Sequence, residues 1–224
     1  MRRLTLPAAV PTGLSVWQVD LKAPFLVDFP QSLSASEKAR AREYAHVGER
    51  DRFLRTRAAL RTLLSQALSC PPDDIRLETG PYGKPQLQPD HRSHLAFNVS
   101  HAGNFALIAL SENREVGVDI ECFNPELNIH ELAPSVLTPA EYQRVRGSQQ
   151  PVRAFFHHWV GKEAVLKALG VGIGQLLTHL SLSPEERGNY NIHLGSLNDL
   201  NHPSCYAHQL VAPEGYVAAL AWLR

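Results

Sequence analysis

The sequence predicts an α+β fold made of two similar halves. Two long segments, at about 49–69 and 151–169, have apolar residues at helical spacing, and short runs typical of strands accompany each of them. The sequence shows no repeat of fixed period, yet each half offers one long helix and several strands. We therefore expect two α+β halves packed together, residues 1–112 and 113–224, with the boundary in a polar turn near 111–116.

The elements of the first half follow from local patterns. Leu14–Asp20 alternates apolar and polar residues, which is typical of a strand. Ser34 or Ser36 opens a helical stretch, and Pro71-Pro72 ends the long helix. Short apolar runs separated by turn residues predict three more strands, at 75–78, 95–99 and 104–110.

The second half begins with the strand Gly117–Glu121. Residues 122–137 have no clear period and are expected to form an irregular loop, after which Thr138 and Pro139 fit the cap and first position of a helix. The long helix ends at the glycine-rich segment 170–174. Four further strands are expected, around 177–182, 191–194, 204–210 and 215–222.

The composition is that of a soluble globular protein, with 44% hydrophobic and 20% charged residues. Pro7 and Pro11 interrupt any apolar run near the N-terminus, and no stretch approaches the roughly 20 apolar residues of a membrane span. The three cysteines are far apart and have no metal-ligand spacing, so neither a disulfide framework nor a zinc site is expected. We expect a cytoplasmic protein that does not bind membranes.

The net charge of zero hides two regions of opposite sign. Residues 37–61 contain eight Lys/Arg and four Asp/Glu, whereas residues 111–141 contain seven Asp/Glu and one Arg. A basic helical region favours an anionic partner, and an acidic cluster favours a cation or a basic partner. The alternative is that both regions are simply solvated surfaces.

Four residues are candidates for one acidic site. Asp119 and Glu121 share a face of their strand, so their carboxylates lie side by side. Glu163 falls within the apolar arc of the second long helix, where an unpaired carboxylate is costly, and Lys167 follows one turn later. The plainer alternatives are a solvated strand face and a structural Glu163–Lys167 ion pair. An all-oxygen ligand set favours a hard cation such as Mg²⁺, which commonly binds phosphate substrates as well.

Several cationic residues could hold such a phosphate. Lys84 lies in a tight turn after Gly83, and His101 lies where a loop at a strand end can present both its ring and the Ser100 hydroxyl. Each has a plainer interpretation as a solvated surface residue. Arg57 lies in the apolar arc of its helix, and we interpret it as structural and paired to an acid. The candidates for phosphate are Arg40, Arg52, Lys84 and His101.

Four motifs together resemble one known family, the Sfp-type 4′-phosphopantetheinyl transferases. They are YGKP at 82–85, FNVSH at 97–101, GVDIE at 117–121 and WVGKEAVLK at 159–167, and the resemblance covers about residues 35–220. It implies a pseudo-dimeric α+β fold whose halves meet around coenzyme A and Mg²⁺. It also implies transfer of phosphopantetheine from coenzyme A to a serine of an apo acyl or peptidyl carrier protein, by a monomer that does not bind nucleic acid.

The resemblance also implies a role for each matching residue. Asp119, Glu121 and Glu163 would bind the metal, and Lys167 would contact the coenzyme A phosphates. Glu163, or a water that it orients, would act as the general base. The residues expected to hold the nucleotide and its 3′-phosphate are Lys84, Ser100, His101, Arg40 and Arg52. The segment 122–137 and the helix that follows are expected to dock the carrier protein.

Two other functions remain as alternatives. A Mg²⁺-dependent phosphodiesterase or nuclease would also combine acids with a basic helix, and its affinity for nucleic acid would fall steeply with salt. A catalytically silent module that binds coenzyme A would bind its ligand without needing Glu163.

Overall fold

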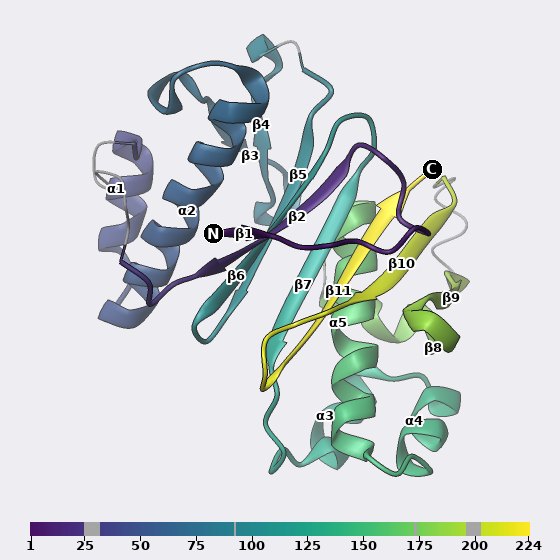
Figure 1. Cartoon of the computed structure of the whole chain (residues 1–224). Coiled ribbons are helices and arrows are strands. Elements are labelled where there is room, and N and C mark those ends of the chain that lie inside the picture. The colour runs from purple at the N-terminus through teal and green to yellow at the C-terminus, as the bar shows by residue number, and fades with distance from the viewer. Residues whose placement is uncertain (25–31, 92, 173, 196–202) are drawn as a thin grey trace.

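The structure is a computed structural model that describes residues 1–24, 32–91, 93–172, 174–195 and 203–224, and Figure 1 shows its two halves side by side. Each half has an antiparallel sheet and one long helix packed against it. The predicted α+β fold is confirmed, whereas the division between residues 112 and 113 stays a prediction. Within the described ranges, no helix is both long enough and apolar enough to cross a membrane.

The N-terminal half is a four-stranded antiparallel sheet with two helices beside it (Figure 1). The strands lie in the order β1 (Arg2–Arg3), β2 (Leu14–Asp20), β6 (Phe105–Ser111) and β5 (Ala96–Ala102). The helices are α1 (Ala35–Arg42) and α2 (Val47–Leu68), and a small hairpin joins β3 (Leu77–Thr79) to β4 (Pro85–Leu87). Ser34 caps α1 with its side chain, and Glu37 completes a capping box that satisfies backbone donors at the helix start.

The C-terminal half is built around α5 (Pro151–Leu169). This helix packs on a three-stranded antiparallel sheet in the order β10 (Cys205–Leu210), β11 (Tyr216–Leu223) and β7 (Val116–Cys122). Two shorter helices, α3 (Ile129–Val136) and α4 (Pro139–Arg146), and a hairpin of β8 (Ser181–Pro184) and β9 (Tyr190–His193) complete it. The 3₁₀ turns whose bounds lie wholly within the described residues are η1 (Pro72–Asp74), η2 (Pro81–Gly83), η3 (Pro89–His91), η4 (Gly174–His179) and η5 (Glu186–Gly188).

Side chains from β5 join the two halves at the edge of β7. The Val118 N–H donates a hydrogen bond of 2.9 Å to Asn98 Oδ1, and the Ile120 N–H donates one of 3.4 Å to Ser100 Oγ. Asn98 and Ser100 are two residues apart on a strand, so they face the same way and can reach alternate backbone donors of β7. The polar positions of FNVSH therefore satisfy buried backbone groups at the junction of the halves.

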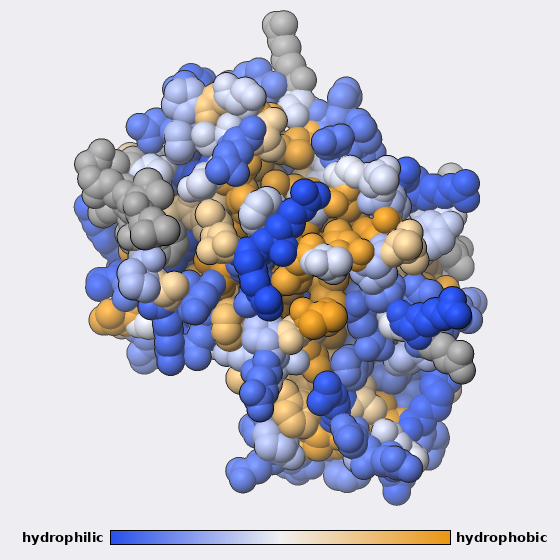
Figure 2. Space-filling model, in the orientation of Figure 1, coloured by the Kyte–Doolittle hydropathy of each residue, from blue (hydrophilic) through white to orange (hydrophobic). Residues whose placement is uncertain are grey.

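The apolar core extends through both halves. One cluster lies between α5 and the C-terminal sheet, one lies between α2 and the N-terminal sheet, and a third joins residues of β2, β6, β7 and β11. On the face drawn in Figure 2, apolar surface gathers over the strands in the middle, while the surface toward the edges is mainly hydrophilic. The core thus holds the β5–β7 junction rigidly between two packed layers.

Most predicted elements are confirmed, and three predictions are wrong. The bounds predicted for β2 and α5 agree with the structure, and Thr138 forms the expected cap with Pro139 at the first position. The segment 122–137 is not wholly irregular, because α3 forms within it. Ser100 and His101 lie inside β5 rather than in the turn after it, and 174–179 forms a 3₁₀ turn before the strand at Ser181.

Candidate active site

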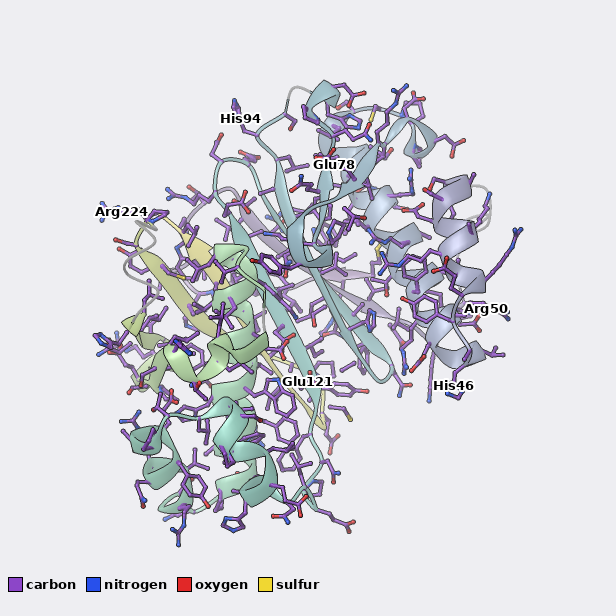
Figure 3. The ribbon with its side chains drawn as sticks, turned by 180° about the vertical axis from the view of Figure 1, so that it is seen from behind. His46, Arg50, Glu78, His94, Glu121 and Arg224 are labelled. Atoms are coloured by element: carbon purple, nitrogen blue, oxygen red, sulfur yellow. The ribbon has the colours of Figure 1, made fainter. Side chains whose placement is uncertain are left out.

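Three carboxylates from two elements meet beside the junction of the halves. Asp119 and Glu121 come from β7 and Glu163 comes from α5, and each offers one oxygen within 4.8 Å of the other two. In Figure 3, Glu121 lies beside α5, with His46 and Arg50 across from it at the start of α2. The predicted acidic site is therefore assembled from residues far apart in the sequence.

Gly117 explains why α5 comes so close to β7. It lies on the same face of the strand as Asp119 and Glu121, and a Cβ atom built on it would be 2.0 Å from the Ala164 carbonyl oxygen and 2.5 Å from the Ala168 nitrogen. Backbone atoms cannot move aside as a flexible side chain can. The glycine of GVDIE thus lets the helix backbone rest directly on the strand.

Hydrogen bonds fix the orientation of these acids. Lys167 Nζ lies 2.5 Å from Asp119 Oδ1 and 3.3 Å from Glu163 Oε2, and the Ser100 hydroxyl donates to Asp119 Oδ1 over 2.7 Å. The Trp159 indole N–H donates to Glu163 Oε1 over 2.6 Å. Both the strand and the helix carboxylates are therefore held in place by neighbouring side chains.

The crowding of like charges changes the proton affinities at the site. Burial, together with the charges of Asp119 and Glu163, raises the pKa of Glu121 to about 7. Burial and Asp119 also raise the pKa of Glu163. Burial alone would lower the pKa of Lys167, but Asp119 and Glu163 outweigh it and raise that pKa. Lys167 is therefore a fixed positive charge between Asp119 and Glu163.

The site fits a hard divalent cation. Asp119 is 1% exposed, and its Oδ2 atom is buried without a hydrogen-bond partner in the described residues. A buried carboxylate oxygen left without a partner costs free energy unless a ligand satisfies it. Three carboxylates with no His or Cys among them form the all-oxygen donor set that suits Mg²⁺.

A small cationic cavity of about 160 Å³ lies between α1, α2 and β5. Arg40, Arg57 and His101 line it, and both guanidinium groups lie over the Phe53 ring, at 5.7 Å and 5.5 Å from its centroid. The His101 side chain reaches solvent, but partial removal from water and then the charge of Arg52 lower its pKa. The cavity therefore presents arginine charge at neutral pH beside a neutral imidazole.

A larger groove of about 700 Å³ continues from the cavity, because Pro85 and Val99 line both. Its walls come from both halves: the η2 turn and β5 on one side, and the C-terminal end of α5 with the segment after it on the other. The residues lining it are Tyr82, Gly83, Lys84, Pro85, Asn98, Val99, Leu166, Lys167, Gly170, Val171, Gly172, Gly174 and Leu176. The groove is mainly apolar, with Lys167 at the end nearest the acids.

The side chain of Lys84 connects the two halves. Its Nζ lies 3.1 Å from Glu115 Oε2 and donates to the Lys167 carbonyl oxygen over 3.0 Å. That carbonyl belongs to the last turn of α5, where a cation is favourable. The ammonium of Lys84 thus ties the η2 turn to the helix that carries Glu163 and Lys167.

Comparison with known proteins identifies the family. Residues 115–221 match the model of the 4′-phosphopantetheinyl transferase superfamily, and residues 21–113 match the model of the 4′-phosphopantetheinyl transferase N-terminal region. The 4′-phosphopantetheinyl transferase HetI of Nostoc sp. is 35% identical over 177 residues, which cover 76% of this chain and 75% of HetI. This chain belongs to the 4′-phosphopantetheinyl transferase superfamily.

The likeness to other members spans most of the chain. The protein slr0495 of Synechocystis sp. is 34% identical over 213 residues, covering 92% of this chain and 86% of its own length. The 4′-phosphopantetheinyl transferase Sfp of Bacillus subtilis is 26% identical over 194 residues, covering 86% of this chain and 83% of Sfp. The predicted resemblance to the Sfp-type transferases is therefore confirmed.

In this transferase, the predicted site residues fall into three groups. Asp119, Glu121, Glu163, Lys167 and Ser100 come together, although Ser100 binds Asp119 rather than facing the cationic cavity. Arg40 and His101 line that cavity, and Arg52 is close enough to affect the pKa of His101. The ammonium of Lys84 lies between Glu115 and the backbone carbonyl oxygen of Lys167, at the end of α5.

The sequence interpretation missed one contact of this transferase and predicted another that does not form. Trp159 orients Glu163 through a hydrogen bond. The two residues are four positions apart on one helix, so this contact could have been predicted from helical spacing alone. Arg57 was expected to pair with an acid, but among the described residues no carboxylate lies within 4.0 Å of its guanidinium. Its acidic neighbour Glu37 instead bonds Arg61 over 2.8 Å.

Proposed function

We propose that this protein transfers 4′-phosphopantetheine from coenzyme A to a serine of an apo acyl or peptidyl carrier protein and releases 3′,5′-ADP. The observation that carries the proposal is the cluster of Asp119, Glu121 and Glu163 around Lys167, placed where the two halves meet in a member of this family. Such a cluster combines a cation site, a fixed positive charge and a carboxylate of raised pKa. These are the parts that phosphoryl-type transfer requires.

Coenzyme A matches the surface next to this cluster. Its pyrophosphate would lie beside Lys167, its 3′-phosphate would enter the cationic cavity with Arg40 and His101, and its uncharged parts would lie in the larger groove. Lys84 lines that groove but uses its ammonium to hold α5, so its turn would meet the nucleotide through other atoms. Arg52 would add positive charge near His101.

Asp119, Glu121 and Glu163 would hold Mg²⁺. When bound, Mg²⁺ neutralises negative charge on the pyrophosphate. Lys167 contributes the same kind of neutralisation from the protein itself, because its charge is fixed between Asp119 and Glu163. The hydrogen bond from Ser100 turns one oxygen of Asp119 toward Lys167 and leaves the buried Oδ2 free for the cation.

Glu163 acts as the general base. Its raised pKa brings its proton affinity closer to neutral pH, which improves a carboxylate as a proton acceptor. Glu163 accepts the proton of the carrier serine while the serine oxygen bonds to the phosphorus that bears pantetheine. The bond from that phosphorus to the bridging oxygen breaks, and the electron pair leaves with 3′,5′-ADP. Trp159 keeps the carboxylate directed during this step.

The carrier protein would dock beside the end of β7. The chain runs from Glu121 directly into the segment that holds α3 and the start of α4, so a protein bound there could bring its serine to Glu163. Because one chain supplies both halves of the site, we expect the protein to act as a monomer. Its three cysteines are free in the structure, which suits a cytoplasmic location.

The proposal is tested by incubating the protein with coenzyme A, Mg²⁺ and apo carrier proteins of fatty acid, polyketide and peptide type. Intact mass measurement then follows each carrier. We expect at least one carrier to gain the mass of one phosphopantetheine group, and only when Mg²⁺ is present. If no carrier gains this mass, the protein is not such a transferase.

The role of Glu163 is tested with Glu163→Gln, which keeps the size of the side chain but removes its basicity. We expect transfer to fall by a factor of about 100 or more, the usual contribution of a general base, while coenzyme A still binds. Glu185→Gln, an exposed position in the β8–β9 turn, is the matched control and should behave as wild type. Turnover of Glu163→Gln at the wild-type rate would remove Glu163 from the role of base.

The two alternative functions give different results in the same assays. A nuclease would bind nucleic acid with strong salt dependence, and a silent module would bind coenzyme A without modifying any carrier. Neither has a specific observation in its favour, and membership of the transferase superfamily favours neither.

A further inference from the structure

The turn between β5 and β6 is hydrogen-bonded to both halves of the molecule. The Asn104 N–H donates a hydrogen bond of 3.0 Å to the hydroxyl of Tyr216, the first residue of β11. The Asn104 carbonyl oxygen accepts one of 2.8 Å from the Leu21 N–H, directly after β2. Figure 1 places this turn and the start of β11 at the same end of β7, the lower end in that view. Asn104 therefore links the N-terminal sheet to the sheet that carries two of the candidate metal ligands.

The position of Tyr216 is itself fixed relative to Glu121. The next residue on β11, Val217, lies opposite Glu121 in the register of β11 and β7. The Phe123 N–H donates to the Gly215 carbonyl oxygen over 2.7 Å, so the chain that leaves β7 is bound to the residue before Tyr216. A displacement of Tyr216 would therefore also displace the end of β7.

The hydroxyl of Tyr216 fits closely against the turn. Gly103 has a φ of 51°, in the left-handed region that favours glycine, and a Cβ atom built on it would overlap the Tyr216 hydroxyl oxygen. The Tyr216 ring also meets the Phe105 ring edge to face, with the ring centroids 5.1 Å apart. The residues on either side of Asn104 thus hold the hydroxyl in the position that its hydrogen bond requires.

This hydrogen bond continues a row of polar contacts along the junction of β5 and β7. Asn98 and Ser100 of β5 accept hydrogen bonds from alternate N–H groups of β7. The next position in that pattern is Ala102, whose methyl group can neither donate nor accept a hydrogen bond. The side chains of β5 therefore offer no such contact at the end of the junction, next to the acidic cluster. Tyr216 provides one there from the neighbouring strand.

The junction sets the spacing between two binding regions. His101, two residues before Gly103 on β5, lines the cationic cavity of the N-terminal half, whereas Glu121 on β7 belongs to the acidic cluster. Under the proposed function, coenzyme A contacts both regions at once. A ligand of this kind binds tightly only when the spacing of its two sites is fixed before it binds.

We propose that Tyr216 is a positioning residue that fixes the spacing between His101 and Glu121 through its hydrogen bond to Asn104. Its ring lies on the opposite face of the sheet from the Glu121 carboxylate, because Tyr216 is paired with Cys122, the next residue of β7. Tyr216 therefore acts on the ligand only through the backbone. The effect on coenzyme A rests on the proposed function, whereas the effect on the turn does not.

The effect on the turn is tested by amide hydrogen exchange, measured by NMR, in wild type and Tyr216→Phe. This variant keeps the aromatic ring and loses only the hydroxyl. We expect the Asn104 amide to exchange about threefold to tenfold faster, the range for losing one hydrogen bond between uncharged groups, and the Val118 amide to change less than about twofold. Tyr206→Phe, at an exposed position of β10, is the matched control and should change neither amide. An Asn104 amide that exchanges at the wild-type rate in Tyr216→Phe would overturn the proposal.

The effect on spacing is tested by calorimetry with three ligands in the presence of Mg²⁺. Coenzyme A would contact both halves, adenosine 3′-monophosphate only the cationic cavity, and pyrophosphate only the acidic cluster. We expect Tyr216→Phe to weaken the binding of coenzyme A about threefold to tenfold and that of the two smaller ligands less than about twofold. Equal weakening of all three would mean a general loss of structure, and an unchanged affinity for coenzyme A would mean that Tyr216 does not set the spacing. Either result refutes the proposal.

A second variant tests the same contact from the other side. Gly103→Ala places its methyl group against the Tyr216 hydroxyl, so we expect the same selective loss of coenzyme A binding. In the Tyr216→Phe background its effect should be smaller, because the oxygen atom that it would overlap is absent. Fully additive effects would show that the two residues act separately and would contradict the proposal. Absence of carrier modification by wild type would refute only the transferase function, and the exchange rate of the Asn104 amide would still decide the role of Tyr216.

Discussion

Replacing Lys162 with methionine should greatly destabilise the protein. Its side chain is 0% exposed, and its Nζ donates to Glu141 Oε2 over 2.6 Å, to the Val136 carbonyl over 2.7 Å and to the Leu177 carbonyl over 2.8 Å. Lys162→Met leaves the charge of Glu141 buried without its counter-ion, and removing one member of a buried pair typically costs about 3–5 kcal/mol. For a chain of this size, a loss of about 4 kcal/mol lowers the melting temperature by about 8–16 °C.

The loss is measurable by urea unfolding followed through tryptophan fluorescence, with the slope of the transition checked for two-state behaviour. Lys38→Met, at an exposed position of α1, is the matched control and should change the free energy of unfolding by less than about 0.5 kcal/mol. The double variant Lys162→Met with Glu141→Gln should recover part of the loss, because it removes both charges. A cost below about 1 kcal/mol for Lys162→Met alone would refute the reasoning, since the buried pair would then contribute no more than a surface pair.

Two further predictions concern the acidic site. Gly117→Ala places a Cβ atom 2.0 Å from the Ala164 carbonyl oxygen, so α5 must move away from β7. We expect urea unfolding to show that the free energy of unfolding falls by about 1–3 kcal/mol or more, and we expect weaker binding of Mg²⁺. Wild-type values for both quantities would contradict this prediction. Glu121 has an ordinary pKa of 4.5 that rises to about 7 in the fold, so without metal its contribution to stability is present below 4.5 and lost as pH rises through 7. Mg²⁺ favours the ionised carboxylate, and the rise in melting temperature that it causes should be larger at about pH 8 than at about pH 6. Glu121→Gln should reduce this difference, and an equal effect of Mg²⁺ on wild type at both pH values would contradict the role of Glu121.

Local signals predicted the long helices because those signals are complete within each segment. The helix at Pro151–Leu169 has a proline at its first position, an apolar arc along its length and Gly170 at its end, where the backbone φ of 70° favours glycine. The helix α3 could not be predicted in the same way. It has only eight residues and contains Pro134, and its last carbonyl oxygen, that of Val136, accepts a hydrogen bond from Lys162 on α5. Tertiary contacts of this kind leave no periodic pattern in the segment they stabilise.

In the candidate site too, some residues could be predicted from local spacing and others depend on tertiary contacts. The two carboxylates of β7 share a face because strands have a period of two, and Glu163 with Lys167 follows from the helical spacing, so these residues could be predicted together. The partners of Ser100, Lys84 and Arg57 could not, because each depends on which side chain arrives from another part of the chain. Ser100 meets Asp119 only because β5 runs along the edge of β7.

The fold determines which negatively charged group the ammonium of Lys84 contacts. An ammonium in a tight turn can bind a phosphate, a carboxylate or a helix end, and the sequence does not distinguish them. In the folded chain, the last turn of α5 and Glu115 both lie within reach, and these two negative groups take its hydrogen bonds. Arg57 is the opposite case, because an acidic partner was expected for it and the nearby carboxylate of Glu37 bonds Arg61 instead. The fold thus gives partners to Lys84 and leaves Arg57 without an acidic partner among the described residues, although each residue alone could have formed such a pair.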